Sequence, residues 1–317
     1  MQTAGHGAHA LAERGRTMRR EYLMLIAATF IWGSGHPIGK LILAEITPLQ
    51  LSMLSSVLGA LAVAFGLVVK RRLSNLAQLR GRGLTLALLS GAIMFFLYPN
   101  LSFSALQQIP ASANAILVAT STIFVAILSP IVLKEKLDIR GYVAVVVSFM
   151  GVAFVVLSTG QRSASLLGLN LLGCSLSLAG ALAAASYTMI GRKAMARHDA
   201  LSVTLVGSVL GGVLLAVVVQ GTSGFVEIAH ASLRTDALVA YWGIFSGLAY
   251  VMFYDSLKRL EATKASSFIY LSPLFAVVLS IAILGEAMTL TFVGGMALIL
   301  GGIWGTQRSR SAPQSTG

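Results

Sequence analysis

Three aromatic residues lie well inside long apolar runs of this sequence. Tyr98 and Tyr250 each lie about 14 residues into their runs and are 152 positions apart, and Trp32 lies near the middle of the first run. A buried tyrosine needs a partner for its hydroxyl group, and an aromatic face attracts a cation or packs on another ring. These residues are candidates for ligand binding, and helix packing is the alternative for each.

His36 and Pro37 follow Trp32 by one turn and interrupt the same apolar run. Proline has no backbone N–H and leaves the carbonyl one turn earlier unpaired, so we expect a kink here. Histidine changes charge near neutral pH, since its ordinary pKa is about 6.5. His36 is therefore expected either to be a hydrogen-bonded part of the kink or to bind a ligand and titrate.

Other hydrogen-bonding side chains occur inside or near the apolar runs. Because such groups are costly to expose to lipid, they should face protein or water. Some are expected only to join helices, and the rest complete the candidate binding set. The set is Ser34, Asn100, Asn114, Ser121, Tyr187, Tyr270 and Ser272. Aromatic residues nearer the ends of runs are expected in interfacial belts, namely Tyr22, Tyr241, Trp242 and Trp304.

Two prolines and two glutamates are candidates for shaping or gating such a site. Pro273 is expected to bend its run and free a backbone carbonyl, as Pro37 does. Glu135 and Glu286 occupy equivalent positions after two runs. Their duplication favours a shared structural task, pairing with cations or exposed backbone amides, over gating.

The sequence offers little for catalysis or metal binding. The eleven acidic residues avoid the middle of the apolar runs, where an unpaired charge costs at least about 2.5 kcal/mol. Cys174 is the only cysteine, so no disulfide and no cysteine metal site forms within one chain. A Gly-Thr-Ser-Gly string at 221–224, with His230 nearby, fits a turn better than a catalytic pair. We expect no metal, no cofactor and no enzymatic activity.

Composition indicates a membrane protein. Of the 317 residues 56% are hydrophobic and 11% are charged, and the mean hydropathy is +0.83, which is more apolar surface than one soluble core buries. Continuous apolar stretches such as 143–157 fit helices rather than the alternating strands of a barrel. The formal charge of +12 does not indicate nucleic acid, because the basic residues are scattered at the ends of runs.

The apolar runs predict ten transmembrane helices. Spans of about 20 residues cross a bilayer, and the runs lie at 22–43, 48–69, 84–104, 111–133, 139–157, 166–191, 200–220, 236–257, 263–284 and 288–305. With the amino terminus in the cytoplasm, 20 of the 23 Lys and Arg residues face the cytoplasm, and Lys40, Arg162 and Arg234 face outside. Both termini are therefore expected in the cytoplasm.

The chain repeats itself once. Nine residues between 106 and 151 recur between 257 and 302 at an offset of 151, and 56–59 recurs as 208–211 at an offset of 152. Each copy holds five spans, and this odd number inverts the second copy across the membrane. The predicted fold is an all-α membrane protein with ten transmembrane helices in two inverted five-helix repeats. Its expected parts are a basic cytoplasmic tail at 1–21, a first repeat at 22–157, an outer linker at 158–165, a second repeat at 166–305 and a disordered tail at 306–317.

Local patterns coincide with this plan. They are Trp32-Gly33-Ser34 with Gly39-Lys40, Ala111-Ser112-Ala113 through Pro130 to Glu135, and Ala265-Ser266-Ser267 through Ser272-Pro273 to Gly285-Glu286. In this order, and duplicated, they resemble the EamA-type family of the drug/metabolite transporter superfamily over about residues 22–305.

The resemblance implies a secondary transporter of the cell inner (plasma) membrane, often an exporter of amino acids or related amphiphilic compounds. It implies a central cavity between the two halves, which alternating access would open to each side in turn. The implied partners are a small-molecule substrate and the lipid bilayer, with the chain a monomer or weak homodimer. Many members of the family have an aromatic or small polar residue where this chain has His36. The difference implies that this chain belongs to a separate substrate subclass. A channel is the alternative, although no duplicated ring of like charges occurs, and an intramembrane enzyme fits less well.

Overall fold

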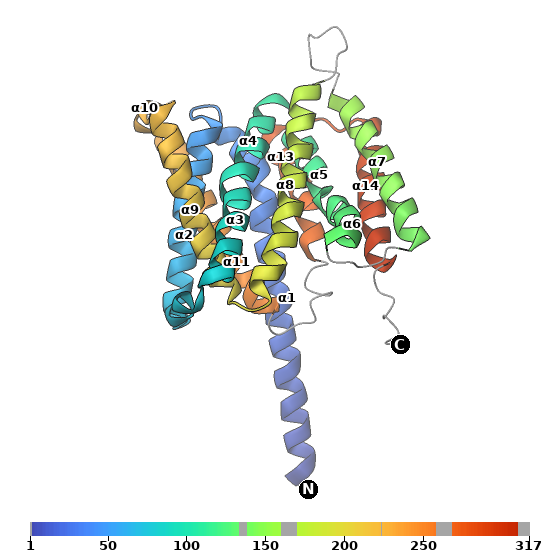
Figure 1. The fold of residues 1–317 in the computed structure, drawn as a ribbon. Helices are drawn as coiled ribbons and strands as arrows, with labels where there is room; N and C mark the ends of the chain where they lie inside the picture. The colour runs from blue at the N-terminus through green and yellow to red at the C-terminus, as the bar shows by residue number, and fades with distance from the viewer. Residues whose placement is uncertain (1, 133–137, 160–169, 223, 258–267, 310–317) are drawn as a thin grey trace.

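The computed structural model describes residues 2–132, 138–159, 170–222, 224–257 and 268–309, and every regular element in these ranges is helical (Figure 1). Up to residue 159 the elements are α1 (Gln2–Ile42), α2 (Pro48–Val69), η1 (Leu73–Gln78), α3 (Gly81–Gly91), η2 (Ala92–Leu97), α4 (Tyr98–Gln108), α5 (Ala111–Ala119), α6 (Ser121–Val132) and α7 (Ile139–Thr159). They continue with α8 (Leu171–Met195), α9 (Ala200–Gly221), α10 (Val226–Ala229), α11 (Leu233–Leu257), η4 (Phe268–Tyr270), α13 (Leu271–Leu284) and α14 (Leu290–Ser309).

The chain is a multi-pass membrane protein. Seven segments of the described residues are long and apolar enough to cross a bilayer, and two shorter apolar segments, Phe268–Leu284 and Leu290–Gly305, follow them. The seven are Pro48–Val69, Gly81–Gln108, Ala111–Leu128, Ile139–Ser158, Leu171–Met195, Ala200–Gly221 and Leu233–Ser256. Large apolar side chains on these helices face outward, such as Phe65, 64% exposed, and Val217, 68% exposed. Apolar surface of this kind suits lipid rather than water.

The two ends of the bundle are named here by their place in Figure 1. The first part of α1 extends beyond the lower end, and the connections after α2 and α8 also lie there. The upper end carries the connection between α1 and α2 and the short helix α10. At the end of α14, the guanidinium of Arg308 lies 4.1 Å from the centre of the Trp304 ring.

Glycines let α7 and α14 cross closely. A Cβ atom on Gly151 would lie 2.7 Å from the carbonyl oxygen of Gly295, and one on Gly302 would lie 2.5 Å from that of Ala144. Side chains would not fit, so the two backbones pack against each other, as is common between membrane helices. Gly151 and Gly302 are equivalent in the sequence repeat, as are Ala144 and Gly295. Each helix therefore uses the same position to approach the other.

Small residues also let other helices approach each other closely. α2 packs against both α9 and α11, and α1 packs against both α11 and α13. A Cβ atom on Gly91 of α3 would lie 2.8 Å from the carbonyl oxygen of Gly207 of α9, and one on Gly33 of α1 would lie 2.5 Å from that of Ser272. Helices from the two ends of the sequence are thus interleaved in one bundle.

A π-helical turn, η2, joins α3 to α4. Pro99 in the first turn of α4 has no N–H to donate to the carbonyl of Phe95. The Ser56 hydroxyl of α2 donates to that carbonyl instead, over 2.9 Å. The turn, which brings Phe95 and Tyr98 into the bundle, is thereby fastened to α2.

Two helices begin within one residue of equivalent positions inside longer apolar runs. Thr120 separates α5 from α6, and η4 gives way to α13 at Leu271, which is the residue equivalent to Thr120. Pro273 falls in the first turn of α13, where proline costs no backbone hydrogen bond. It therefore accompanies a helix start rather than a bend within one helix. Pro37, in contrast, lies inside α1, which continues to Ile42.

Candidate functional site

Aromatic rings from three elements meet around Trp32 of α1. The Trp32 ring lies 5.1 Å from that of Tyr250 and 5.4 Å from that of Phe253, both on α11. The ring of Phe95 in η2 lies 5.9 Å from Tyr250. Rings at these centroid distances attract one another. α1, α11 and the π-helical turn therefore share one aromatic contact.

Tyrosines extend this contact to α4 and α8. Tyr254, one turn after Tyr250, stacks on it at 6.2 Å, and its hydroxyl lies 3.2 Å from that of Tyr187 on α8. Tyr98 on α4 lies near Tyr250. We name this group the aromatic cluster; its members are Trp32, Phe95, Tyr98, Tyr187, Tyr250, Phe253 and Tyr254.

A second group, the polar cluster, surrounds Asn114 at the start of α5. The Asn114 amide nitrogen lies 3.1 Å from Nδ1 of His36 and 3.2 Å from the hydroxyl of Ser102. The Ser177 hydroxyl donates to the Asn114 amide oxygen over 2.6 Å. Since an amide nitrogen only donates, His36 Nδ1 accepts, and the proton of the neutral ring is on Nε2. The polar cluster therefore joins α1, α4, α5 and α8.

The two clusters are continuous through α4. Ser102 follows Tyr98 by one turn, so the two side chains share a helix face, and their hydroxyl groups interact. The aromatic cluster thus adjoins the Ser102 hydroxyl group, which accepts a hydrogen bond from the Asn114 amide. A ligand between them would meet rings at one end and hydrogen-bonding groups at the other.

α11 approaches α1 again one turn beyond Trp32. The Ser34 hydroxyl lies 3.1 Å from that of Tyr241, and a Cβ atom on Gly35 would overlap the Trp242 ring. Both aromatic side chains point toward α1, although their positions near the end of a run predicted an interfacial belt. Ser34 therefore belongs to the α1–α11 contact.

Several cluster side chains are only partly buried. Trp32, His36, Tyr98, Tyr187 and Tyr250 are half-buried. The indole nitrogens of Trp32 and Trp242 and the amide oxygen of Asn100 are buried and have no hydrogen-bond partner among the described residues. Buried polar groups normally find partners, so these atoms are available to a ligand or to water.

Glu286 has its partners at the upper end. Its carboxylate accepts from the backbone N–H of Ala111 at 2.7 Å, from the N–H of Ser112 at 3.0 Å and from the Ser112 hydroxyl at 2.6 Å. A carboxylate at this place satisfies the first donors of α5 and complements the helix dipole. Lys40 donates to the carbonyl of Ile109, at the end of α4, over 2.8 Å. Glu135, the residue equivalent to Glu286 in the first repeat, lies outside the described residues.

The structure brings together some of the residues expected from sequence and not others. The clusters contain Trp32, His36, Tyr98, Asn114, Tyr187 and Tyr250. Tyr270 instead packs against an apolar group of α5, α6, α7 and α14, and the Asn100 amide donates to the Phe96 carbonyl. Ser121 begins α6, Ser272 presents its carbonyl to Gly33, and within the described ranges no hydrogen bond joins either side chain to the clusters.

Five cluster residues were not expected from sequence, namely Phe95, Ser102, Ser177, Phe253 and Tyr254. Tyr254 and Ser102 each follow a predicted tyrosine by four residues and are themselves equivalent in the repeat, so helical spacing around Tyr98 and Tyr250 was the usable signal. Ser177 has no such signal, because its role depends only on where α8 packs. No group of metal-ligating side chains occurs in the described part of the chain.

A sequence model of the EamA-like transporter family matches residues 19–157 and 171–307. The chain belongs to the EamA-like transporter family. The aromatic cluster of this EamA-like protein draws Trp32, Phe95 and Tyr98 from the first matched range and the other members from the second. The polar cluster draws His36, Ser102 and Asn114 from the first range and Ser177 from the second.

Relatives of this EamA-like protein carry transporter names. It is 25% identical over 296 residues to an uncharacterized transporter of Archaeoglobus fulgidus, with 92% of this chain and all of the relative covered. It is 25% identical to the uncharacterized transporter YvbV of Bacillus subtilis, with 89% of each chain covered. YcxC of the same organism, also an uncharacterized transporter, is 30% identical over 66% of this chain and 70% of its own length.

A solved crystal structure shares the fold. It superposes with a TM-score of 0.62 at 19% sequence identity and covers 90% of this chain and 95% of its own. Membrane transport is therefore the activity that the family and its named relatives support for this chain.

Proposed function

We propose that this chain is a secondary transporter that exports a small amphiphilic metabolite, such as an amino acid or a related compound. The observation that carries the proposal is the aromatic cluster, which both family-matched ranges supply and which adjoins the polar cluster. Because rings and neutral hydrogen-bonding groups make up both clusters, they suit a substrate with an apolar body and a polar head.

Alternating access is the proposed mechanism, by rocking of residues 22–157 against 166–305. Ten spans in two inverted repeats would place equivalent elements on opposite sides of the membrane. The reciprocal crossing of Gly151 and Gly302 supports this arrangement, as do the helix starts after Thr120 and Tyr270. α1 and the two shorter apolar helices near the carboxyl terminus would add three spans to the seven long ones.

The proposed orientation puts the lower end in the cytoplasm of a cell with this chain in its inner membrane. Basic side chains favour the cytoplasmic side of a membrane. Those of the α2–α3 connection and of the end of α8 lie at the lower end, and Lys40 and Arg234 lie toward the upper end. A monomer or a weak homodimer would carry out transport, since each chain supplies both halves of its clusters.

Two measurements test the proposal. Metabolites inside and outside cells with and without the chain would first name the substrate, which we expect to accumulate outside only when the chain is present. Counterflow in proteoliposomes would then show faster uptake of labelled substrate when unlabelled substrate is inside. A conductive flux that does not saturate would instead indicate a channel and contradict the transporter proposal.

The site is tested by matched variants in the same vesicles. Trp32→Ala and Tyr250→Ala remove cluster rings and are expected to reduce counterflow at least tenfold. Phe245→Ala removes an exposed ring on the same helix as Tyr250 and serves as the control, with little change expected. Equal effects of all three variants would contradict a binding role for the aromatic cluster.

A further inference from the structure

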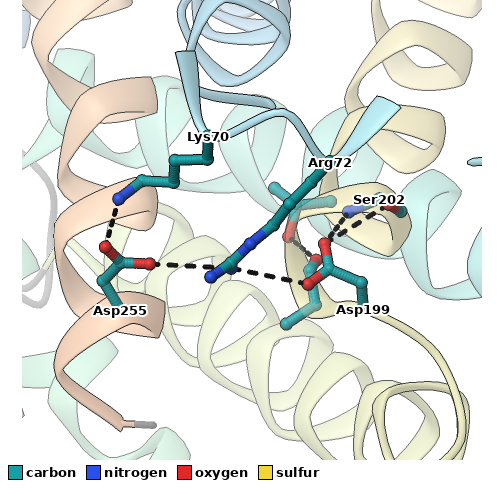
Figure 2. A network of polar contacts seen from close by, with 7 residues as sticks. Lys70, Arg72, Asp199, Ser202 and Asp255 are labelled. Atoms are coloured by element: carbon teal, nitrogen blue, oxygen red, sulfur yellow. Dashed lines mark hydrogen bonds and ion pairs between the residues drawn. The ribbon is translucent and has the colours of Figure 1, made fainter. Parts of the chain in front are cut away.

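Four charged residues join the two family-matched ranges at the lower end of the bundle. Lys70 forms an ion pair with Asp255 near the end of α11. Arg72 lies between two carboxylates, with Nη1 3.7 Å from an oxygen of Asp199 and 3.7 Å from an oxygen of Asp255. Figure 2 shows the guanidinium extended across this space. Two cations from the first range thus face two anions from the second.

The end of α2 has a backbone shape that aims these cations. The N–H of Arg71 donates to the Val68 carbonyl and that of Arg72 to the Leu67 carbonyl, each over 2.9 Å. This pattern closes a helix with a left-handed residue, and Arg71 has φ 53°. Glycine usually takes that conformation at lower cost. The chain therefore turns back sharply beneath α2, which leaves Lys70 and Arg72 facing α11 and α9.

The other half of the repeat has an equivalent backbone hydrogen bond without the charges. Gly224 is equivalent to Arg72, and its N–H donates over 2.7 Å to the carbonyl of Val219, which is equivalent to Leu67. Thr222 stands in the place of Lys70. Gly224 has no side chain to offer in place of the guanidinium, and its carbonyl accepts from the Gln50 amide over 3.0 Å. Both halves thus share this backbone hydrogen bond, and the first half adds the charged side chains.

The charged group lies directly below the aromatic cluster. Asp255 follows Tyr254 in sequence, and Tyr250 and Tyr254 pack against an apolar group that contains Leu67 of α2 and Leu201 of α9. Thr204 of α9 is buried there and interacts with both Tyr187 and Tyr254. A molecule leaving the aromatic cluster toward the lower end would have to part these tyrosines and then the ion pairs.

We infer that Lys70, Arg72, Asp199 and Asp255 form a cytoplasmic gate, which holds the two halves together below the substrate site and must break for that site to open to the cytoplasm. The inference rests on the proposed function for its direction and its substrate. The carboxylates are mostly buried, with side chains 7% exposed in Asp199 and 15% in Asp255. Ion pairs in such surroundings are screened less by salt than surface pairs are.

The experiment measures access to Thr204 rather than transport. Cys174 is the only cysteine, so Cys174→Ser with Thr204→Cys creates one reactive thiol above the gate. A membrane-impermeant methanethiosulfonate reagent is applied to inside-out vesicles, and the labelling rate is measured. Asp255→Asn, which keeps the side-chain size, and Arg72→Gln, which shortens the side chain and removes its charge, are expected to raise this rate at least tenfold. Lys193→Ala, an exposed cation at the same end, is the control and should leave it unchanged.

A charge exchange gives a second measurement. Lys70→Asp alone should speed labelling, and Lys70→Asp with Asp255→Lys should return the rate to within about threefold of the parent. An unchanged rate in Asp255→Asn and Arg72→Gln would overturn the gate, and so would a double exchange that stays as fast as the single one. If the gate variants label faster but the parent protein shows no counterflow, the gate is supported and only the transporter proposal is contradicted.

Discussion

The rings of Trp32 and Tyr250 pack 5.1 Å apart, with an angle of 59° between their planes. Trp32 belongs to the first family-matched range and Tyr250 to the second, so this pair spans the two halves. Under the proposed rocking of the two halves, their relative movement would change this contact.

Tyr250→Phe and Tyr250→Ala separate the ring from its hydroxyl group. Phenylalanine keeps the contacts with Trp32 and Phe95, and we expect counterflow within about threefold of the parent. Alanine removes aromatic pairs worth about 0.5 to 1.5 kcal/mol each, and we expect a lower thermal midpoint in detergent as well as weak transport. Equal transport loss in the two variants would show that the hydroxyl rather than the ring is required.

Asn114→Ala should destabilise the protein by breaking the polar cluster. The change leaves the Ser177 hydroxyl and His36 Nδ1 without the partners they have in the structure, and a buried group without a partner costs about 1 to 3 kcal/mol. Scanning calorimetry in detergent should show a midpoint lower by several degrees. Ser121→Ala is the control, and an equal fall there would argue against a special role for Asn114.

Glu286→Ala should loosen the start of α5. Hydrogen bonds to a charged group contribute about 1.5 to 3 kcal/mol, and this carboxylate accepts three. Glu286→Gln keeps one acceptor oxygen and should lose about half as much stability. Hydrogen-exchange measurements should show faster exchange of the Ala111 and Ser112 amides in both variants. The increase should be larger in Glu286→Ala than in Glu286→Gln. Unchanged exchange in Glu286→Ala would contradict the capping role.

Glu45 and Glu227 should make stability depend on acid pH. The Ser232 backbone N–H, and then its hydroxyl, lower the pKa of Glu45, and the Gln50 amide lowers the pKa of Glu227. A lowered pKa in the folded state stabilises the protein above the ordinary value of 4.5, and this contribution is lost as pH falls through the folded value. Glu45→Gln and Glu227→Gln should therefore be less stable than the parent at pH 7, with the difference shrinking below pH 4.5. Thermal midpoints across that pH range check this, and a difference that grows in acid would contradict it.

Gly302→Ala and Gly301→Ala form a matched pair on α14. A Cβ atom on Gly302 would meet the Ala144 carbonyl and Ser148, whereas one on Gly301 would meet nothing within 4 Å. Overpacking costs about 1 to 3 kcal/mol, so Gly302→Ala should lower the thermal midpoint by several degrees. Gly301→Ala should leave it unchanged or raise it slightly, because alanine favours helix more than glycine. A similar loss in both would contradict the close crossing of α7 and α14.

Hydrophobic runs predicted most helix positions, because membrane helices need long apolar stretches whatever their neighbours. The run at 48–69 coincides with α2, whose start is signalled by Thr47 and Pro48. The π-helical turn at 92–97 was not predicted. Its run continues without a polar break, and the turn depends on Ser56 of another helix reaching the Phe95 carbonyl.

The repeat pointed to Tyr98 and Tyr250, since it placed them at equivalent depths. It gave no sign of the contact between His36 and Asn114, because Ala265 stands at the position equivalent to Asn114. The polar cluster takes His36, Ser102 and Asn114 from the first half and Ser177 from the second, through helix packing that no sequence period specifies. The lower-end ion pairs were missed for the same reason: Lys70, Arg72, Asp199 and Asp255 each border a span, which accounts for a charge without naming its partner.

The three tryptophans of this chain occupy three different surroundings. Trp32 lies in the aromatic cluster, Trp242 lies over Gly35, and Trp304 is 59% exposed near the end of α14. Phenylalanine at 242 and 304 would leave Trp32 as the single indole emitter. Brominated lipids would quench Trp304 far more than Trp32, since only the former faces outward. The protein thus carries its own optical probe for occupancy of the cluster, so candidate compounds are open to screening by emission before any substrate has been radiolabelled.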